Sequence, residues 1–366
     1  MKDYIRNIVF SVKQYRFILY FLCFQSVLFG LIFLIIGKIP VYRVGITYFF
    51  IFLFALMIFI PSNALFIVIK YIIAGEKKPT LSLLKHYYHK LSDGVFVTHF
   101  VMTATLFMTT IFIFSSIKSS IPIILPFWAD PYIIDFERFL FLGKLPHEFI
   151  GFLFEIDFVI IVLNFFYNMW NIFVVLLMFF VSLTSNNKLR FHILHASVLA
   201  WFIAGNWMAI LLASVGPVYY EYFFDGSITY VPLMENLESI DLRTGMVWAL
   251  NAQRMLLNSY IHPDSPISGI SAMPSLHVLF AFFIAFTAMK VGRFAGIAGY
   301  LFALLIFAGS VVLGWHYAVD GIVGVLTAIA FWKISHPITL RAIGRENTES
   351  IEAPSNFGEG SQASAP

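Results

Sequence analysis

The chain contains a single cysteine, Cys23, among 366 residues. One cysteine cannot form a disulfide within the chain or supply a cysteine-based metal site, so both are excluded. Charged residues make up only 12% of the sequence, and the formal net charge is +3. A net charge this small and this scattered excludes the basic surface that a nucleic-acid partner would need.

Apolar and aromatic residues are abundant, in contrast to the charged residues. Hydrophobic residues make up 60% of the chain and aromatic residues 18%, including 43 phenylalanines. A soluble domain is about half apolar and about a quarter charged. Repeated apolar stretches of roughly 20 residues are typical of a polytopic membrane protein. The composition therefore predicts an all-α fold, a polytopic membrane helical bundle with about eight transmembrane helices.

Eight apolar stretches follow one another along the chain, without an internal repeat. They cover residues 17–37, 45–74, 95–117, 158–183, 191–215, 274–290, 295–314 and 317–335. The N-terminal segment "MKDYIRNIVFSVKQYRF" has no small-residue cleavage site, so we expect the first stretch to remain as a membrane helix. The sixth has the shortest apolar run, which suits a helix that begins below the membrane surface or beside a cavity.

Lysine and arginine predict the orientation in the membrane. With a cytoplasmic N-terminus, 16 of the 23 basic residues fall on the cytoplasmic side and 7 on the other side. The positive-inside rule favours this arrangement, with both termini cytoplasmic. The sixth and eighth stretches then begin at the same non-cytoplasmic face, where His277 and His316 can lie side by side.

The segment "HYAVD" places His316 and Asp320 four residues apart, on one face of a helix. An aspartate that accepts the N–H of one imidazole nitrogen fixes the tautomer and leaves the other nitrogen free to act as a nucleophile. Ionisable residues inside a membrane are candidates for function. The alternative is a structural His–Asp pair that ties two helices together.

The segment "SAMPSLH" opens the sixth stretch. Ser271 can cap a helix, Pro274 suits its first turn, and Ser275 supplies a hydroxyl. The free N–H groups of a helix start favour a phosphate, and His277, one turn inside, could protonate a departing alkoxide. The alternative is an ordinary helix start with a hydrogen-bonded histidine.

Together, "PSLH" and "HYAVD" resemble the second and third signatures of the type 2 phosphatidic acid phosphatase superfamily. Within it, they are most similar to the inositol phosphorylceramide synthase branch, whose members carry a proline-serine-x-histidine segment and an H-Y-x-x-D segment. "GISAMPSLHV" and "DPYIIDFERFLFLGKLP" also look like the bacterial members of that branch. The resemblance covers about residues 130–325.

The resemblance implies a role for each matching residue. His316 would attack phosphorus to give a phosphohistidine, and Asp320 would orient it. His277 would protonate the leaving group and then serve as base for the acceptor hydroxyl. The resemblance implies no metal and no cofactor.

Three departures from the phosphatase signatures bear on the reaction. Leu276 stands where the second signature has glycine, Ser310 stands where the third has arginine, and the lysine-to-arginine-proline first signature is not recognisable. We therefore expect Arg254, or next Arg243, to help Ser275 bind the substrate phosphate. An interfacial arginine that faces lipid headgroups is the alternative for each.

These features predict a lipid phosphotransferase with membrane lipids as donor and acceptor. One alternative is a lipid phosphatase or polyprenyl diphosphatase that uses water as acceptor, and another is a transporter. The predicted domains are N-terminal transmembrane helices at 1–117, a catalytic membrane domain at 118–338 with an interfacial segment and an external loop, and a disordered cytoplasmic tail at 339–366. The site is expected on the non-cytoplasmic face of a cell or Golgi-type membrane. The sequence carries no signal for the oligomeric state.

Overall fold

The computed structural model describes residues 2–224, 226–262 and 269–344. It is 82% helical, and the described residues contain no strand. Within these ranges, seven helical segments are long and apolar enough to cross a membrane. The predicted all-α membrane bundle is therefore confirmed.

The seven segments follow the predicted order along the chain. They are α2 (Arg16–Ile36), α3 (Arg43–Ile73), α5 (Gly94–Lys118), α9 (Asp157–Leu183), the continuous run of α10 (Asn187–Leu199), η2 (Ala200–Met208) and α11 (Ala209–Leu211), then α16 (Arg293–Val312) and α17 (Ala318–Ile343). The predicted sixth span is the shorter helix α15 (Leu276–Val291), with 16 residues. A membrane-spanning helix needs about 20 residues, so α15 is too short to cross alone.

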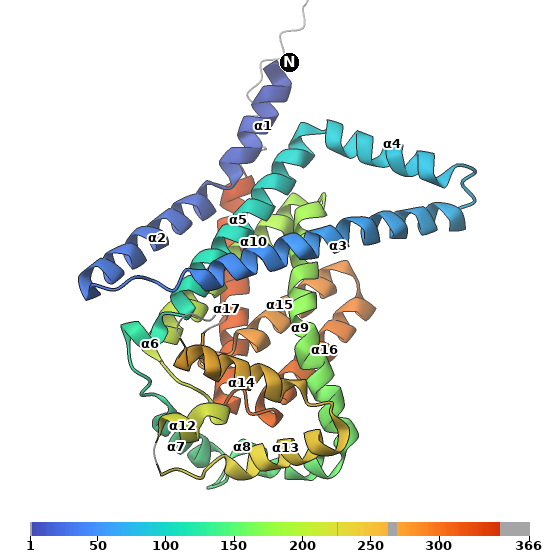
Figure 1. Ribbon diagram of the computed structural model, residues 1–366. Helices are drawn as coiled ribbons and strands as arrows, with labels where there is room; N and C mark the ends of the chain where they lie inside the picture. Colours follow the sequence, from blue (N-terminus) through green and yellow to red (C-terminus); the bar gives the residue numbers. More distant parts are fainter. Residues whose placement is uncertain (1, 225, 263–268, 345–366) are drawn as a thin grey trace, which may run out of the picture.

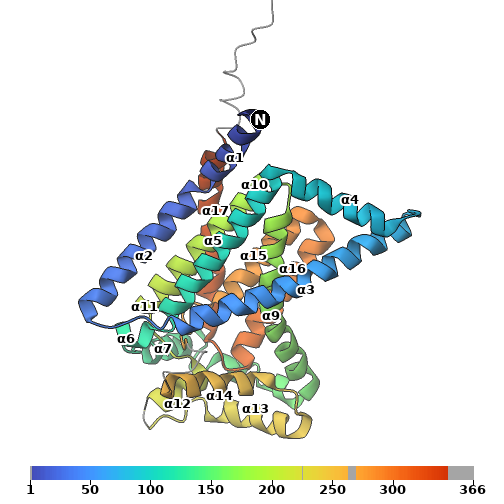
Figure 2. The same cartoon turned by 45° about the horizontal axis from the view of Figure 1, so that its top comes forward.

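The remaining helices lie mainly at the two ends of the bundle. They are α1 (Lys2–Gln14), α4 (Pro79–Ser92), α6 (Ile121–Ile124), α7 (Asp130–Leu140), α8 (Pro146–Phe149), η1 (Gly151–Glu155), η3 (Pro217–Tyr219), α12 (Tyr220–Phe223), α13 (Val231–Thr244) and α14 (Trp248–Ile261). Both views place α7, α12, α13 and α14 at one end, with α1 at the other (Figures 1 and 2). We call the end with α7, α13 and α14 the site end.

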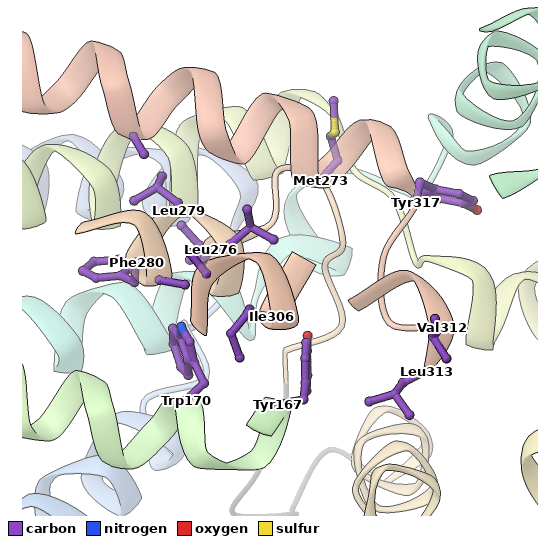
Figure 3. Close-up of a cluster of buried hydrophobic side chains, with 14 of the residues drawn as sticks. Tyr167, Trp170, Met273, Leu276, Leu279, Phe280, Ile306, Val312, Leu313 and Tyr317 are labelled. Carbon is purple, nitrogen blue, oxygen red and sulfur yellow. The ribbon is translucent and has the colours of Figure 1, made fainter. Parts of the chain in front are cut away.

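Helix α15 lies at the centre of the bundle, against α16, α17 and α9. Val278, Leu279 and Phe280 point in successive directions around the helix, and each is 0% exposed. A helix that is apolar on all sides is buried by its neighbours. Figure 3 shows Leu276, Leu279 and Phe280 packed within the buried cluster, with Ile306 of α16 and Trp170 of α9. The short helix is therefore surrounded by protein over its first half, whereas Met289 and Val291 at its end are exposed.

The structure differs from the predicted boundaries at the last helix. We expected the final span to end at 335, before Pro337, but α17 continues through Pro337 to Ile343. A proline inside a membrane helix removes one backbone hydrogen bond, which neighbouring groups can compensate. The helix therefore extends past the predicted start of the tail at 339, and residues 345–366 lie outside the described residues.

Candidate active site

The structure brings His277 and His316 together at the site end. His277 is the second residue of α15, and His316 lies in the short loop between α16 and α17. The two imidazole rings have centroids 5.9 Å apart and planes inclined by 57°. Two histidines this close can act on one small group held between them.

Asp320 holds the ring of His316. The Nδ1 atom of His316 lies 3.3 Å from Oδ2 of Asp320, and that oxygen also accepts the main-chain N–H of Tyr317 at 3.0 Å. Asp320 is 0% exposed and His316 is 6% exposed. A carboxylate that accepts the Nδ1 proton leaves the Nε2 lone pair available for attack.

The segment before α15 begins the helix one turn later than we expected. Ser275, not Ser271, is the N-cap: it has an extended backbone, and its hydroxyl accepts the N–H of Val278 at 3.4 Å. Pro274 therefore precedes the cap, and His277 lies in the first turn. The N–H of Ser275 donates to the main-chain oxygen of Asp320 at 3.1 Å, so the starts of α15 and α17 are directly joined.

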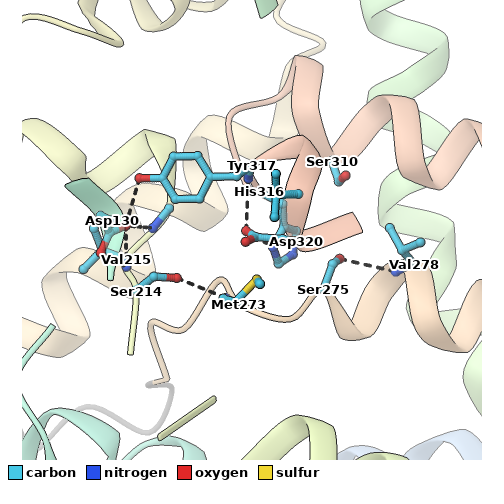
Figure 4. A network of polar contacts seen from close by, with 12 residues as sticks. Asp130, Ser214, Val215, Met273, Ser275, Val278, Ser310, His316, Tyr317 and Asp320 are labelled. Carbon is cyan, nitrogen blue, oxygen red and sulfur yellow. Dashed lines mark hydrogen bonds and ion pairs between the residues drawn. The ribbon is translucent and has the colours of Figure 1, made fainter. Parts of the chain in front are cut away.

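Two buried carboxylates of α7 fix the loop that carries His316. Oδ1 of Asp130 accepts the hydroxyl of Tyr317 at 2.9 Å, while Oε1 of Glu137 accepts the N–H of Val319 at 3.0 Å. Asp130 is 0% exposed and Glu137 is 1% exposed. Figure 4 shows Asp130 and Tyr317 side by side next to His316 and Asp320. Helix α7 thus positions two residues, Tyr317 and Val319, that lie between His316 and Asp320 in the chain.

Burial shifts the pKa of three ionisable groups around the site, two on α7 and one in the loop between α16 and α17. Burial raises the pKa of Glu137 to about 7, against the opposing effect of its hydrogen bond from Val319. Burial also raises the pKa of Asp130, which its hydrogen bonds partly offset. Burial lowers the pKa of His316, as does the charge of Lys118, while a main-chain hydrogen bond with Ala272 acts in the opposite direction. His316 is therefore neutral at pH 7, the state in which a ring nitrogen can attack.

Aromatic rings enclose His277. The Tyr167 ring stacks on it, with centroids 4.7 Å apart and an interplanar angle of 16°. The Trp170 ring lies on it at 4.2 Å and 37°. The ring of Trp315, the residue before His316, is nearly parallel to that of Tyr167 at 6.2 Å. Rings on α9 and in the α16–α17 loop thus limit how His277 can move.

Lys118 is a cation near both histidines, which we did not predict from the sequence. It is the last residue of α5, and its charge acts on the rings of His277 and His316. The sequence feature that could have identified it is the segment from Lys118 to Leu125 and Pro126. The first signature of the superfamily runs from a lysine to an arginine-proline pair, and this segment runs from a lysine to a leucine-proline pair. The missing arginine hid the pattern.

The two arginines expected to bind phosphate have different surroundings. Arg254 is exposed on α14. Arg243, on α13, forms an exposed ion pair with Asp157 at 2.7 Å and also donates to Ser239. The role of either arginine in phosphate binding stays a prediction, as does that of Ser275, which is 0% exposed and already serves as the helix cap.

The described ranges contain no cluster of three or more His, Cys, Asp or Glu side chains that could hold a metal ion. Searches of curated proteins and of solved structures returned no match. The model of the PAP2 superfamily matches residues 131–334, more than half of the chain. This range includes α7 except its first residue, Asp130, and it includes both histidines and Asp320. The chain therefore belongs to the PAP2 superfamily, whose members are phosphatases and phosphotransferases.

Proposed function

We propose that this protein is a lipid phosphotransferase of the inositol phosphorylceramide synthase type. It would move a phosphorylated head group from a phospholipid donor to the hydroxyl of a second lipid or polyol acceptor. Two observations support the proposal. The ring centroids of His277 and His316 are 5.9 Å apart, and Asp320 forms a hydrogen bond with the Nδ1 atom of His316. These are the groups that two successive displacements at one phosphorus atom require.

The reaction proceeds in two steps. In the first, Nε2 of His316 bonds to phosphorus while the bond from phosphorus to the diacylglycerol oxygen breaks, and His277, which enters the cycle as the imidazolium, gives that oxygen a proton and becomes neutral. In the second, His277 takes the proton of the acceptor hydroxyl, whose oxygen bonds to phosphorus as the P–N bond breaks. Lys118 holds negative charge on the phosphoryl oxygens through both steps. His277 and His316 end each cycle in their starting protonation states.

The residues around the site favour a lipid acceptor over water. Leu276 and the rings of Tyr167 and Trp170 surround His277 with apolar atoms, and Leu276 is only 6% exposed. Ser310, which stands where the phosphatase signature has arginine, is 0% exposed and donates its hydroxyl to the main chain of Phe307. Water is the alternative acceptor, which would make the enzyme a lipid phosphatase or polyprenyl diphosphatase.

The orientation and location follow from the basic residues. We propose that both termini are cytoplasmic and that the site end faces away from the cytoplasm, so both substrates reach the site from within the bilayer. The charge count in the segments between the apolar stretches supports this arrangement.

A labelled donor lipid tests the proposed function. Purified protein in proteoliposomes receives a phospholipid labelled in its head-group phosphate, together with candidate hydroxyl acceptors. Transfer to a lipid acceptor yields a new labelled lipid, transfer to a polyol yields a labelled water-soluble product that forms only when the polyol is present, hydrolysis yields a labelled water-soluble product without any acceptor, and transport yields none of these. His316→Ala should abolish turnover in the first two cases. Full turnover by that variant would refute both.

A further inference from the structure

We infer that the hydroxyl of Tyr167 donates a hydrogen bond to the phosphoryl group during transfer, in the place of the arginine that Ser310 replaces. The inference rests on the proposed function, because it adds one residue to that same site. It makes Tyr167 a neutral partner of Lys118 in binding the phosphoryl oxygens.

Tyr167 contacts both halves of the site. It lies on α9 and is 4% exposed. Its ring stacks on His277, with centroids 4.7 Å apart, and lies nearly parallel to the ring of Trp315, which directly precedes His316. One side chain therefore borders the proposed proton donor and the segment that carries the nucleophile.

The hydroxyl of Tyr167 is buried and has no hydrogen-bond partner within the described part of the chain. Buried hydroxyls are normally paired, because an unmade hydrogen bond costs free energy. Among the other buried tyrosines, the hydroxyl of Tyr15 pairs with His99, that of Tyr219 with the main chain of Gln253, and that of Tyr317 with Asp130. The hydroxyl of Tyr230 is the other buried tyrosine hydroxyl without a partner in the described residues, but no ring contact joins Tyr230 to His277.

The direction of the Tyr167 hydroxyl also bears on the site. Figure 3 shows Tyr167 pointing from α9 toward the segment that carries Met273 and Leu276, with its oxygen at the far end. The hydroxyl therefore points toward the segment that leads into α15 and His277.

A neutral donor suits a site in this position. In the transition state of phosphoryl transfer, negative charge spreads over the equatorial oxygens, and donors aimed at them lower the barrier. An arginine guanidinium beside Lys118 would have to lose its hydration in a site enclosed by aromatic rings, whereas an uncharged phenol is far easier to bury. Tyr167 keeps its own proton throughout, so it changes no proton balance in the two steps.

The test is Tyr167→Phe, which removes the hydroxyl and keeps the ring that stacks on His277. Loss of one transition-state donor should lower kcat by about 100-fold with little change in KM. Inhibition by orthovanadate, which imitates the five-coordinate phosphorus, should weaken by a similar factor. Wild-type kcat and vanadate inhibition in a folded Tyr167→Phe protein would overturn the inference.

A matched control is Tyr15→Phe. Tyr15 is 0% exposed, lies between α1 and α2, and bonds to His99 and Thr103 through its hydroxyl. Helix α1 lies at the end of the bundle opposite the site end. We expect this variant to keep wild-type kcat and vanadate inhibition even if it unfolds at a lower temperature. An equal loss of kcat in both variants would show a general effect of removing buried hydroxyls and would overturn the inference.

Vanadate binding separates failure of the inference from failure of the proposed function. Stabilisation of the wild type by vanadate against thermal unfolding needs no turnover. If the wild type cleaves no lipid but loses vanadate stabilisation on Tyr167→Phe, the lipid assignment is wrong and the role of Tyr167 stands. If Tyr167→Phe does not fold, 4-fluorophenylalanine at position 167 replaces it, because the fluorine fills the place of the hydroxyl but donates no hydrogen bond. This variant should show the same loss of kcat, and wild-type kcat in the folded variant would contradict the inference.

Discussion

The hydroxyl of Tyr317 donates a hydrogen bond to Oδ1 of Asp130 at 2.9 Å, across 187 positions of sequence. The same carboxylate accepts the main-chain N–H groups of Val215 and Gly216, each at 3.0 Å. Asp130 begins α7, and Tyr317 directly follows His316. One buried carboxylate therefore joins three separate segments of the chain beside the nucleophile.

Replacing Asp130 by alanine should destabilise the protein and lower its activity. The change leaves two buried amides and one hydroxyl without their acceptor, at a cost of roughly 1–3 kcal/mol for each unsatisfied group. Tyr317→Phe removes a single hydrogen bond and should cost about 1 kcal/mol. Unfolding of both single variants and the double variant in detergent gives the coupling energy between the two residues. Strictly additive effects would contradict the proposed link.

Glu137 should make stability depend on pH. Its pKa is about 7 in the folded protein, compared with 4.5 for an ordinary glutamate. Between these values the folded protein keeps a proton that the unfolded chain has released. The stabilisation from this group is therefore complete below pH 4.5 and is lost as the pH rises through 7, with a slope of at most about 1.4 kcal/mol per pH unit.

Glu137→Gln tests this dependence, because an amide does not titrate in this range but can still accept the N–H of Val319. We expect the thermal midpoint of the wild type to fall more steeply between pH 4.5 and 7 than that of the variant. The two curves should run parallel outside this window. Parallel curves throughout would show that Glu137 has an ordinary pKa.

Gly324 sets the approach of α17 to α15. A methyl group there would lie 2.7 Å from the main-chain oxygen of Ser275 and 3.4 Å from Cβ of Val278. Gly324→Ala should therefore push the two helices apart and increase the distance between His277 and His316. Because displacements of about 1 Å at a reacting centre can cost about 100-fold, we expect kcat to fall by at least about 10-fold.

The control for this prediction is Gly30→Ala in α2. A methyl group on Gly30 meets nothing within 4 Å, so the variant tests the general effect of adding a methyl group to a membrane helix. It should keep wild-type kcat. If Gly324→Ala also kept it, the close contact between α15 and α17 would not control the site.

The sequence was sufficient to predict the helices and the two histidines, because both appear as local patterns. Apolar runs mark the spans, and His277 and His316 stand out as polar residues within them. The boundary before α15 was wrong because Ser271 and Ser275 lie on either side of Pro274, and both are good caps. Only the backbone geometry in the structure identifies Ser275 as the cap.

The groups that support the site could not be predicted, because their partners are distant in sequence. Asp130 and Glu137 looked like the charged positions of an interfacial helix, but they are buried and bind main-chain N–H groups 85 to 182 positions away. Every residue except proline has a main-chain N–H group, so the sequence does not show which of these groups a buried carboxylate will bind. Tyr167 was likewise hidden, since one tyrosine in an apolar helix carries no signal of its own.

The proposed phosphohistidine can be observed directly. Wild-type protein is mixed with a phospholipid labelled in its head-group phosphate, quenched in alkaline detergent and digested. A phosphorus–nitrogen bond survives base and breaks in acid, so mass spectrometry should find the labelled group on His316, acid-labile and absent from His316→Ala. Label on another residue, or turnover by the wild type with no label on His316 at any time, would contradict the account.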